Sequence, residues 1–352
     1  MPIRFSIERY NQPSIGYRID DRFQVSGFGR DPTPSLVDRI VRAFMFGIIS
    51  VFKPVGLTSR DCVNRIQRSV RPFKVGHAGT LDPIAEGVLI VAVGQATRLI
   101  ELLHELPKVY RGTFRMGCTS ESADTETEVT SLADAPIVSQ EMLVCQIPKF
   151  VGTIQQRPPA YSAVKIDGKR AYDLARKGQN VAMPERSVTI HRIDLLSCSP
   201  SEICLDVSCE SGTYIRSLGR DLALACQSDA VMTHLLRSSV GPFTSELAWT
   251  LESLESREAI TRALVNPAEC LLRDRVRLSE DECRRMRNGL YLELTQDRIE
   301  HNSAKKPRSS NQEAQDCILG LDPSNRLRGI LTQRSPTHWG AALNFDHEDR
   351  SE

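Results

Sequence analysis

The feature that most constrains the fold is a short apolar run, VLIVAVG at 88–94, which directly follows the glycine-rich segment 74–87. A brief run of β-branched residues is typical of a buried strand. A second apolar run, GIISVF, lies at 47–52. The segments 187–196 and 202–210 alternate apolar and polar residues, as paired, half-buried strands do. These segments predict a β-sheet with a buried centre.

Helical patterns separate the predicted strands. One amphipathic helix is predicted after a cap at Thr58 or Ser59, a second over 95–106, and a third after a turn within 211–227. Strands and helices are interleaved without regular βαβ spacing. This order favours an α+β fold, with a mixed, largely antiparallel central sheet flanked by helices, over a doubly wound parallel sheet.

The chain divides into three predicted parts. Residues 1–45 are polar and weakly periodic, which indicates a partly disordered N-terminal extension. Residues 46–268 contain the strands and helices described above and form the predicted main domain. Residues 269–345 contain hairpin-like segments and predict a small β-rich domain, which a polar insert at 301–315 interrupts.

Charge and cysteine usage exclude several classes of protein. The formal net charge of the 352 residues is +1, so a surface for nucleic acid has to be local. The ten cysteines form no C-x-x-C pair and no His-x-x-x-His motif accompanies them, which argues against a metal site. There is no P-loop and no G-x-G-x-x-G motif for a cofactor. We expect free thiols in a reducing cytoplasm, with no membrane segment.

Charge is unevenly distributed along the chain. Residues 51–115 hold ten Lys and Arg against five Asp and Glu, and the following stretch reverses the sign. Its acidic residues, with no Lys or Arg nearby, are Glu121, Asp124, Glu126, Glu128 and Asp134. Such a charge pattern predicts a solvated acidic loop.

Asp82 is the candidate catalytic residue because of its position in GHAGTLDP at 76–83, just before the predicted core strand. The proline that follows favours extended geometry at Asp82, and the glycines let a ligand approach the backbone closely. A carboxylate held on such a loop can act as a nucleophile or a base. Taken alone, an Asp-Pro pair is more often only a turn.

Several segments in one order resemble the motifs of the TruB family, the bacterial tRNA pseudouridine-55 synthases. These segments are KPVGLTS at 53–59, GHAGTLDP at 76–83, GVLIVAVGQATRLI at 87–100, KVYRGTF at 108–114, PPAYSAVKIDGKRAYDLARKG at 158–178 and SGTYIRSL at 211–218. The resemblance covers roughly residues 46–250 and is weaker beyond them. It implies a pseudouridine synthase-like fold with a small C-terminal PUA-like RNA-binding domain.

The resemblance also implies roles for individual residues. Asp82 would be the catalytic aspartate and Arg216 its ion-pair partner, since a guanidinium opposes the neutralisation of a buried carboxylate. Tyr110 would stack on the target uracil once that base has left the RNA. Without the resemblance, Arg216 would be a surface residue at a helix start and Tyr110 an ordinary core tyrosine.

Further residues are implied to bind the RNA. Besides Tyr110, they are His77, Tyr214, Leu235, Arg98, Lys169 and Arg170. His77 would contact the extruded nucleotide, while Tyr214 and Leu235 would line the pocket. Arg98 would contact phosphate or remain a solvated helix residue. Lys169 and Arg170 belong to a basic segment that would hold the T-arm, or would form an ordinary surface helix.

The function implied by the resemblance is the isomerisation of uridine 55 in the T-loop of tRNA, through base flipping and exchange of the glycosidic bond. It needs no metal and no cofactor, and nothing demands more than a monomer. One alternative is a related synthase directed by a guide RNA, against which segment 158–178 argues. Others are a non-catalytic tRNA-binding or chaperone module and a small-molecule enzyme. Direct attack by Asp82 and a glycal route both stay open.

Overall fold

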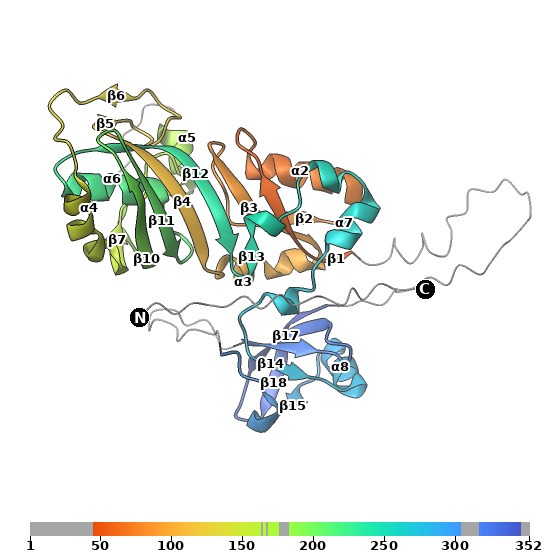
Figure 1. The fold of residues 1–352 in the computed structure, drawn as a ribbon. Helices are drawn as coiled ribbons and strands as arrows, with labels where there is room; N and C mark the ends of the chain where they lie inside the picture. Colours follow the sequence, from red (N-terminus) through yellow and green to blue (C-terminus); the bar gives the residue numbers. More distant parts are fainter. Residues whose placement is uncertain (1–44, 163–164, 167, 176–182, 304–316, 346–352) are drawn as a thin grey trace, which may run out of the picture. The chain divides into compact units, whose positions relative to one another are not determined.

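The computed structural model describes residues 45–162, 165–166, 168–175, 183–303 and 317–345 (Figure 1). The predicted N-terminal extension, except for its last residue, and most of the predicted insert lie outside these ranges. The predicted domain boundaries at 45/46 and 268/269 remain predictions.

A large mixed sheet forms the main part of the described chain (Figure 1). Its strands, in spatial order, are β1 (Phe46–Lys53), β3 (Ala85–Gly94), β12 (Ala230–Val240), β4 (Lys108–Met116), β11 (Glu202–Cys209), β10 (Arg186–Cys198) and β7 (Gly152–Gln156). The neighbours pair antiparallel except for β12 and β3, which run parallel. Two short strands extend it: β2 (Val75–Ala78) beside β3, and β13 (Phe243–Thr244) beside β12. The predicted α+β class is confirmed.

Strand β3 is buried on both faces, which explains why its sequence is a continuous apolar run. Alternate side chains enter two different cores: Val88, Ile90 and Ala92 enter one, and Leu89, Val91 and Val93 the other. The second core is completed by the apolar face of helix α2 (Ser59–Val70). The loop that precedes β3 is therefore anchored to the most buried strand of the sheet.

The helices lie beside the sheet (Figure 1). They are α2, α3 (Ile100–His104), α4 (Gln140–Gln146), α5 (Ala171–Ala175), α6 (Ile215–Ala225) and α7 (Arg257–Ala263). Thr58 caps α2 through a capping box with Asp61, as the cap prediction allowed. The helix predicted over 95–106 is shorter, because the segment begins as a 3-10 turn at Gln95–Leu99 before α3.

Helix α6 packs unusually closely on the sheet at Gly219. A methyl group at this position would lie 2.0 Å from Cε1 of Phe114, a fully buried ring on β4. We expect Gly219→Ala to destabilise the protein by about 1–3 kcal/mol, because overpacking the core outweighs the better helix propensity of alanine. Urea unfolding would measure this change. The double variant with Phe114→Leu should recover part of the loss, and a Gly219→Ala protein more stable than the unaltered one would contradict the prediction.

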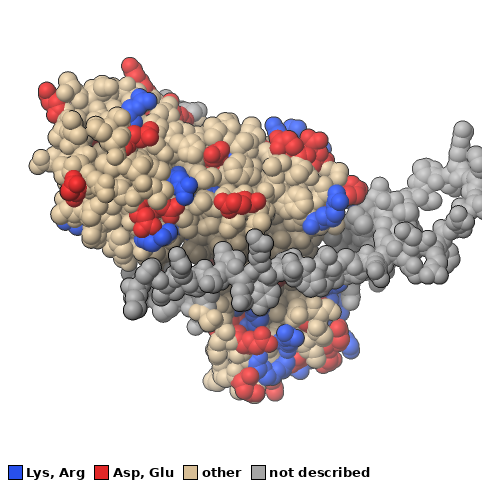
Figure 2. Space-filling model, in the orientation of Figure 1, with Lys and Arg blue, Asp and Glu red and all other residues tan. Residues whose placement is uncertain are grey.

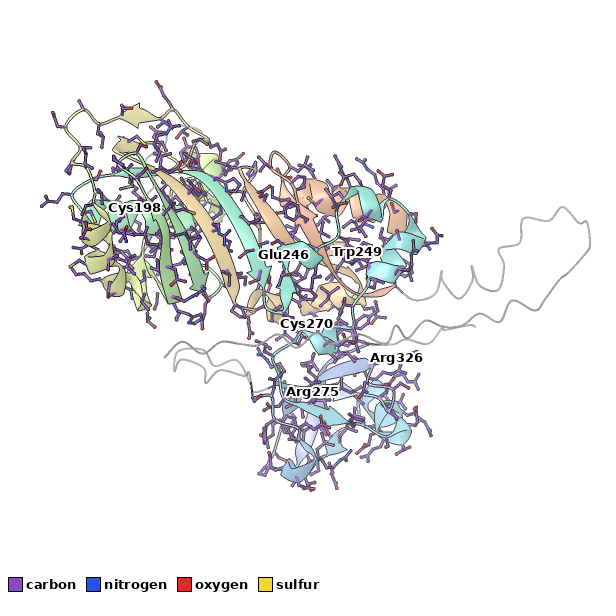
Figure 3. The ribbon with its side chains drawn as sticks, viewed as in Figure 1. Cys198, Glu246, Trp249, Cys270, Arg275 and Arg326 are labelled. Carbon is purple, nitrogen blue, oxygen red and sulfur yellow. The ribbon has the colours of Figure 1, made fainter. Side chains whose placement is uncertain are left out.

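A second, five-stranded sheet follows residue 270. Its order is β14 (Arg275–Arg277), β16 (Cys317–Leu321), β17 (Leu327–Gln333), β18 (His338–Asn344) and β15 (Leu292–Glu293), and helix α8 (Glu280–Arg287) accompanies it. Figure 3 labels Cys270 ahead of this sheet and Arg275 at its first strand. Figure 3 also labels Trp249, whose backbone bridges to Val51 on β1 after the chain has left β13. The predicted β-rich C-terminal part is confirmed.

The remaining short strands are β5 (Cys118–Thr119) with β6 (Thr130–Ser131), and β8 (Lys165–Ile166) with β9 (Lys169–Arg170). None of the helices in the described part of the chain has the length and apolar character needed to cross a membrane. All ten cysteines are free thiols. On the face that Figure 2 shows, basic and acidic side chains are interspersed, as the low net charge predicts.

Candidate active site

The loop that carries Asp82 joins β2 to β3 and is held by the first residue of α2 and by the turn that precedes this helix. The Ser59 hydroxyl accepts a hydrogen bond from the Leu81 N–H at 2.9 Å and donates one to the Leu81 carbonyl at 3.2 Å. The Gly56 N–H donates to the Pro83 carbonyl at 2.8 Å. Two motifs that are separate in the sequence therefore form one structural unit around Asp82.

Ser59 offers a direct test of this unit. We expect Ser59→Ala to destabilise the protein by about 1–3 kcal/mol, because two buried backbone groups of Leu81 lose their partner. Turnover should fall as well, since the residue before Asp82 is no longer fixed. Thr58→Ala is the matched control, because Thr58 caps α2 without contacting Leu81. Urea unfolding and initial rates would measure both variants, and equal effects on turnover would refute the special role of Ser59.

Arg216 pairs with Asp82, as predicted. Its Nη2 lies 3.0 Å from Asp82 Oδ2, and the exposed fractions of the two side chains are 4% and 37%. Arg216 sits in the first turn of α6, so the buried helix holds the cation while the carboxylate still reaches solvent. A partly exposed acid beside a buried guanidinium is accessible to a ligand.

A second carboxylate binds the same guanidinium and was missed by sequence reasoning. Asp124 Oδ2 lies 2.8 Å from Arg216 Nη1, and the Asp124 side chain is completely buried. Its other oxygen accepts hydrogen bonds from the Ser122 hydroxyl at 2.5 Å and the Glu126 N–H at 2.9 Å. The prediction of a solvated acidic loop is therefore wrong at Asp124. The one local signal was the hydroxyl residues on either side of it, since no pattern links it to Arg216.

The two carboxylates share one cation, and this governs the electrostatics of the site. Burial raises the pKa of Asp82 above its usual value, the Arg216 guanidinium opposes that rise, and the Asp124 charge adds to it. Arg216 also donates to the carbonyls of Ser122 at 3.0 Å and Tyr161 at 2.9 Å. Each of the two Nη atoms thus has two partners, and Asp82 is the more exposed of the two carboxylates.

Tyr110 and Leu235 lie on neighbouring strands close to this loop. Tyr110, on β4, is half-buried and packs against the core that contains Leu81 and Leu235. Leu235, on β12, pairs with Ala85 of β3 and is 6% exposed. Whether Leu235 lines the pocket, as the resemblance implies, remains a prediction.

His77 and Tyr214 flank the site from β2 and from the start of α6. Burial lowers the pKa of His77 to about 4, so its ring is neutral near pH 7. Its buried Nδ1 has no hydrogen-bond partner among the described residues. Tyr214 exchanges backbone hydrogen bonds with the Gln156 amide at 2.8 and 3.0 Å, and Arg186 stacks over its ring at 4.6 Å. Whether either side chain contacts RNA remains a prediction.

Among the three basic residues predicted to bind RNA, the structure describes the side-chain contacts of Arg98 alone. Arg98 donates to the Asn344 carbonyl at 2.7 Å and lies over the Phe345 ring, so a phosphate would compete with these contacts. Lys169 and Arg170 form strand β9, but their side chains lie outside the described residues. No group of three metal-ligating side chains occurs in the part of the chain that the structure describes.

Comparisons with known proteins point in one direction. A sequence profile described as "TruB family pseudouridylate synthase (N terminal domain)" matches residues 67–215. A "tRNA pseudouridine synthase B" of Burkholderia mallei is 36% identical over 83% of this chain and 94% of its own length. One from Rhodopirellula baltica is 45% identical, over 56% of this chain and 59% of its own length.

Solved structures are similar in fold at lower sequence identity. A crystal structure of a Cbf5-Nop10-Gar1 complex contains a chain with a TM-score of 0.65 and 23% identity, covering 89% of this chain and 88% of that one. A chain of an archaeal box H/ACA Nop10-Cbf5 complex gives a TM-score of 0.63 at 22% identity. At this identity the similarity concerns the fold alone.

Proposed function

The chain belongs to the TruB family of tRNA pseudouridine synthases, which make pseudouridine 55, and on that premise we propose that Asp82 is the catalytic carboxylate of this reaction. The observation that supports the proposal is the ion pair between Asp82 and the buried Arg216, with Asp82 still partly exposed. The guanidinium opposes the neutralisation of this carboxylate, and the exposed part of the side chain remains available to a substrate that enters from solvent.

The reaction assigns a task to each residue of the site. The target uridine leaves its stack in the T-loop, and Tyr110 replaces part of the lost stacking energy. Asp82 promotes cleavage of the bond between C1′ and N1, whose electron pair stays on the uracil. The base then rotates on Tyr110 and C5 forms the new bond to C1′. The proton on C5 then leaves, and a proton taken up at N1 balances it, so the product is an isomer of the substrate. The proposed steps use only groups of the chain and of the RNA.

The substrate proposal includes how the RNA is held. We propose that the enzyme acts as a monomer in the cytoplasm and binds the T-arm and T-loop without a guide RNA. Lys169 and Arg170 would bind the T-arm, and His77, Tyr214, Leu235 and Arg98 the region around the flipped nucleotide. The match to 94% of the length of a relative named "tRNA pseudouridine synthase B" supports this choice over a guide-directed enzyme.

One experiment tests substrate and site together. Purified protein is incubated with an unmodified tRNA transcript, and pseudouridine is mapped by chemical adduct sequencing. We expect a single product at position 55 of the T-loop without added RNA. A transcript with cytidine at that position is the control and should yield none. Product that appears only after a second RNA is added would favour the guide-directed alternative, and no product on any tRNA would refute the proposal.

A further inference from the structure

Arg237, on β12, is a buried cation that the reaction as described does not use. It is 1% exposed and is among the largest fully buried side chains of the described chain. Its Nε donates to the Val88 carbonyl on β3 at 2.6 Å, and its Nη2 donates to the Gly79 carbonyl at 3.0 Å. Among the described residues, no carboxylate forms an ion pair with it. Burying a charge without a counter-charge costs folding free energy, so we ask which function this arrangement serves.

Tyr110 is the cross-strand neighbour of Arg237. Arg237 and Tyr110 are directly opposite each other in the antiparallel pair of β12 and β4, so their side chains share one face of the sheet. The positive charge of Arg237 also acts on the Tyr110 hydroxyl, because burial raises the pKa of that hydroxyl and Arg237 opposes the rise. The Arg237 guanidinium thus links Tyr110, the proposed stacking platform for the uracil, to strand β3 and to the loop that carries Asp82.

The approach of Arg237 to the loop is close. Gly79, three residues before Asp82, has φ +92°, and a methyl group added to it would lie 3.3 Å from Arg237 Nη1. A planar guanidinium donates in several fixed directions at once, which a lysine ammonium on a flexible stem does not reproduce. The spatial relation between Tyr110 and the Asp82 loop therefore depends on the shape of this side chain as well as its charge.

We propose that Arg237 is a positioning residue of the isomerisation, which fixes Tyr110 relative to the Asp82 loop. This inference rests on the proposed function. During the reaction the uracil is detached from the ribose at N1 and is joined to it again at C5. The distance between Tyr110 and Asp82 therefore affects both the cleavage of the old bond and the formation of the new one. Misplacement by about 1 Å in an active site lowers rates about 100-fold.

The test compares Arg237→Met and Arg237→Lys with the unaltered enzyme on the tRNA transcript. Single-turnover rates at saturating tRNA report the chemical step, and the dissociation constant for tRNA reports binding. We expect Arg237→Met to lower the rate about 100-fold while the dissociation constant changes less than about threefold. Arg237→Lys should remain at least about 10-fold slow, because it keeps the charge and loses the fork. Full activity of Arg237→Lys, or an equal loss of rate and affinity in Arg237→Met, would overturn the proposal.

A double-variant cycle with Tyr110→Phe tests whether Arg237 acts through the Tyr110 hydroxyl. Tyr110→Phe keeps the stacking ring and removes the hydroxyl, so its effect on the rate should be clearly smaller when Arg237 is already replaced. If the loss of rate in the double variant equals the product of the losses in the two single variants, the two residues are independent and the coupling is refuted. If Arg237→Met does not fold, the same double-variant cycle with Arg237→Lys tests whether the two residues are coupled.

Two controls separate this inference from general damage and from the proposed function. Lys108→Met removes another buried cation, whose amine donates to the His104 carbonyl, and should change stability without changing the rate. The unaltered enzyme and an Asp82→Asn variant are measured in parallel. Absence of product with the unaltered enzyme would refute the proposed function, whereas normal product formation by Arg237→Met would refute only the role of Arg237.

Discussion

Replacing Asp82 with asparagine should abolish pseudouridine formation while leaving the protein at least as stable as before. The loss of rate should be on the order of 10⁴-fold or more, because asparagine cannot act as the carboxylate in the cleavage of the glycosidic bond. The tRNA dissociation constant should change little, since phosphate and stacking contacts supply most of the affinity.

The stability part of this expectation follows from the pKa of Asp82. Burial raises this pKa above the value in the unfolded chain, so the fold favours the protonated carboxyl. That contribution is present at acidic pH and is lost as the pH rises through the folded-state pKa. Above the folded-state pKa the ionised carboxylate therefore disfavours the fold, and the neutral amide removes this effect. Arg216 keeps its buried partner Asp124 in the variant.

Single-turnover assays, tRNA binding and urea unfolding at neutral pH would check both parts. Asp134→Asn is the control, because it removes an exposed carboxylate of the same acidic stretch and should change nothing. Activity of Asp82→Asn within about 10-fold of the unaltered enzyme would remove Asp82 from the catalytic role. A loss of several kcal/mol would instead show that Asp82 is needed for the fold.

The local pattern of the sequence predicted much of the fold. The continuous apolar run of β3 and the alternation in β10 and β11 each correspond to a strand with the expected burial. These patterns depend only on which faces of a strand meet the core. The helix predicted over 95–106 was too long, because periodicity alone does not reveal the 3-10 turn with which the segment begins.

The site was only partly predictable from the sequence. The two residues that were not predicted, Asp124 and Arg237, are charged side chains whose burial depends on the tertiary structure. Asp82 and Arg216 lie in recognisable motifs, and the structure brings them together. Asp124 lies 92 positions from Arg216, and its burial depends on the tertiary path of a loop. Arg237 lies two residues after Leu235 on the same strand, so alternation implies a shared face. However, a charged residue on a core face is usually excluded by its desolvation, and sequence reasoning had no reason to expect one there.

Replacing Asp124 should lower the stability of the protein, whereas replacing Asp82 should not. Breaking a buried ion pair by removing one partner costs about 3–5 kcal/mol, because the remaining charge stays buried. Asp124→Ala should lose this amount in urea unfolding, and Asp124→Asn somewhat less, since the amide oxygen still accepts from the Ser122 hydroxyl and the Glu126 N–H. Both variants should also lower the rate, because Arg216 loses one of the two groups that orient it towards Asp82.

The pH dependence of Asp124→Asn distinguishes electrostatic coupling from a purely structural role. The charge of Asp124 contributes to the raised pKa of Asp82, so its removal should lower that pKa. If ionised Asp82 is the active form, the acidic limb of the rate profile moves to lower pH. A limb that moves to higher pH, or a variant as stable as Asp82→Asn, would contradict this account. The contrast has a simple origin: Arg216 without Asp82 keeps a buried counter-charge, whereas Arg216 without Asp124 has only a carboxylate that is one-third exposed.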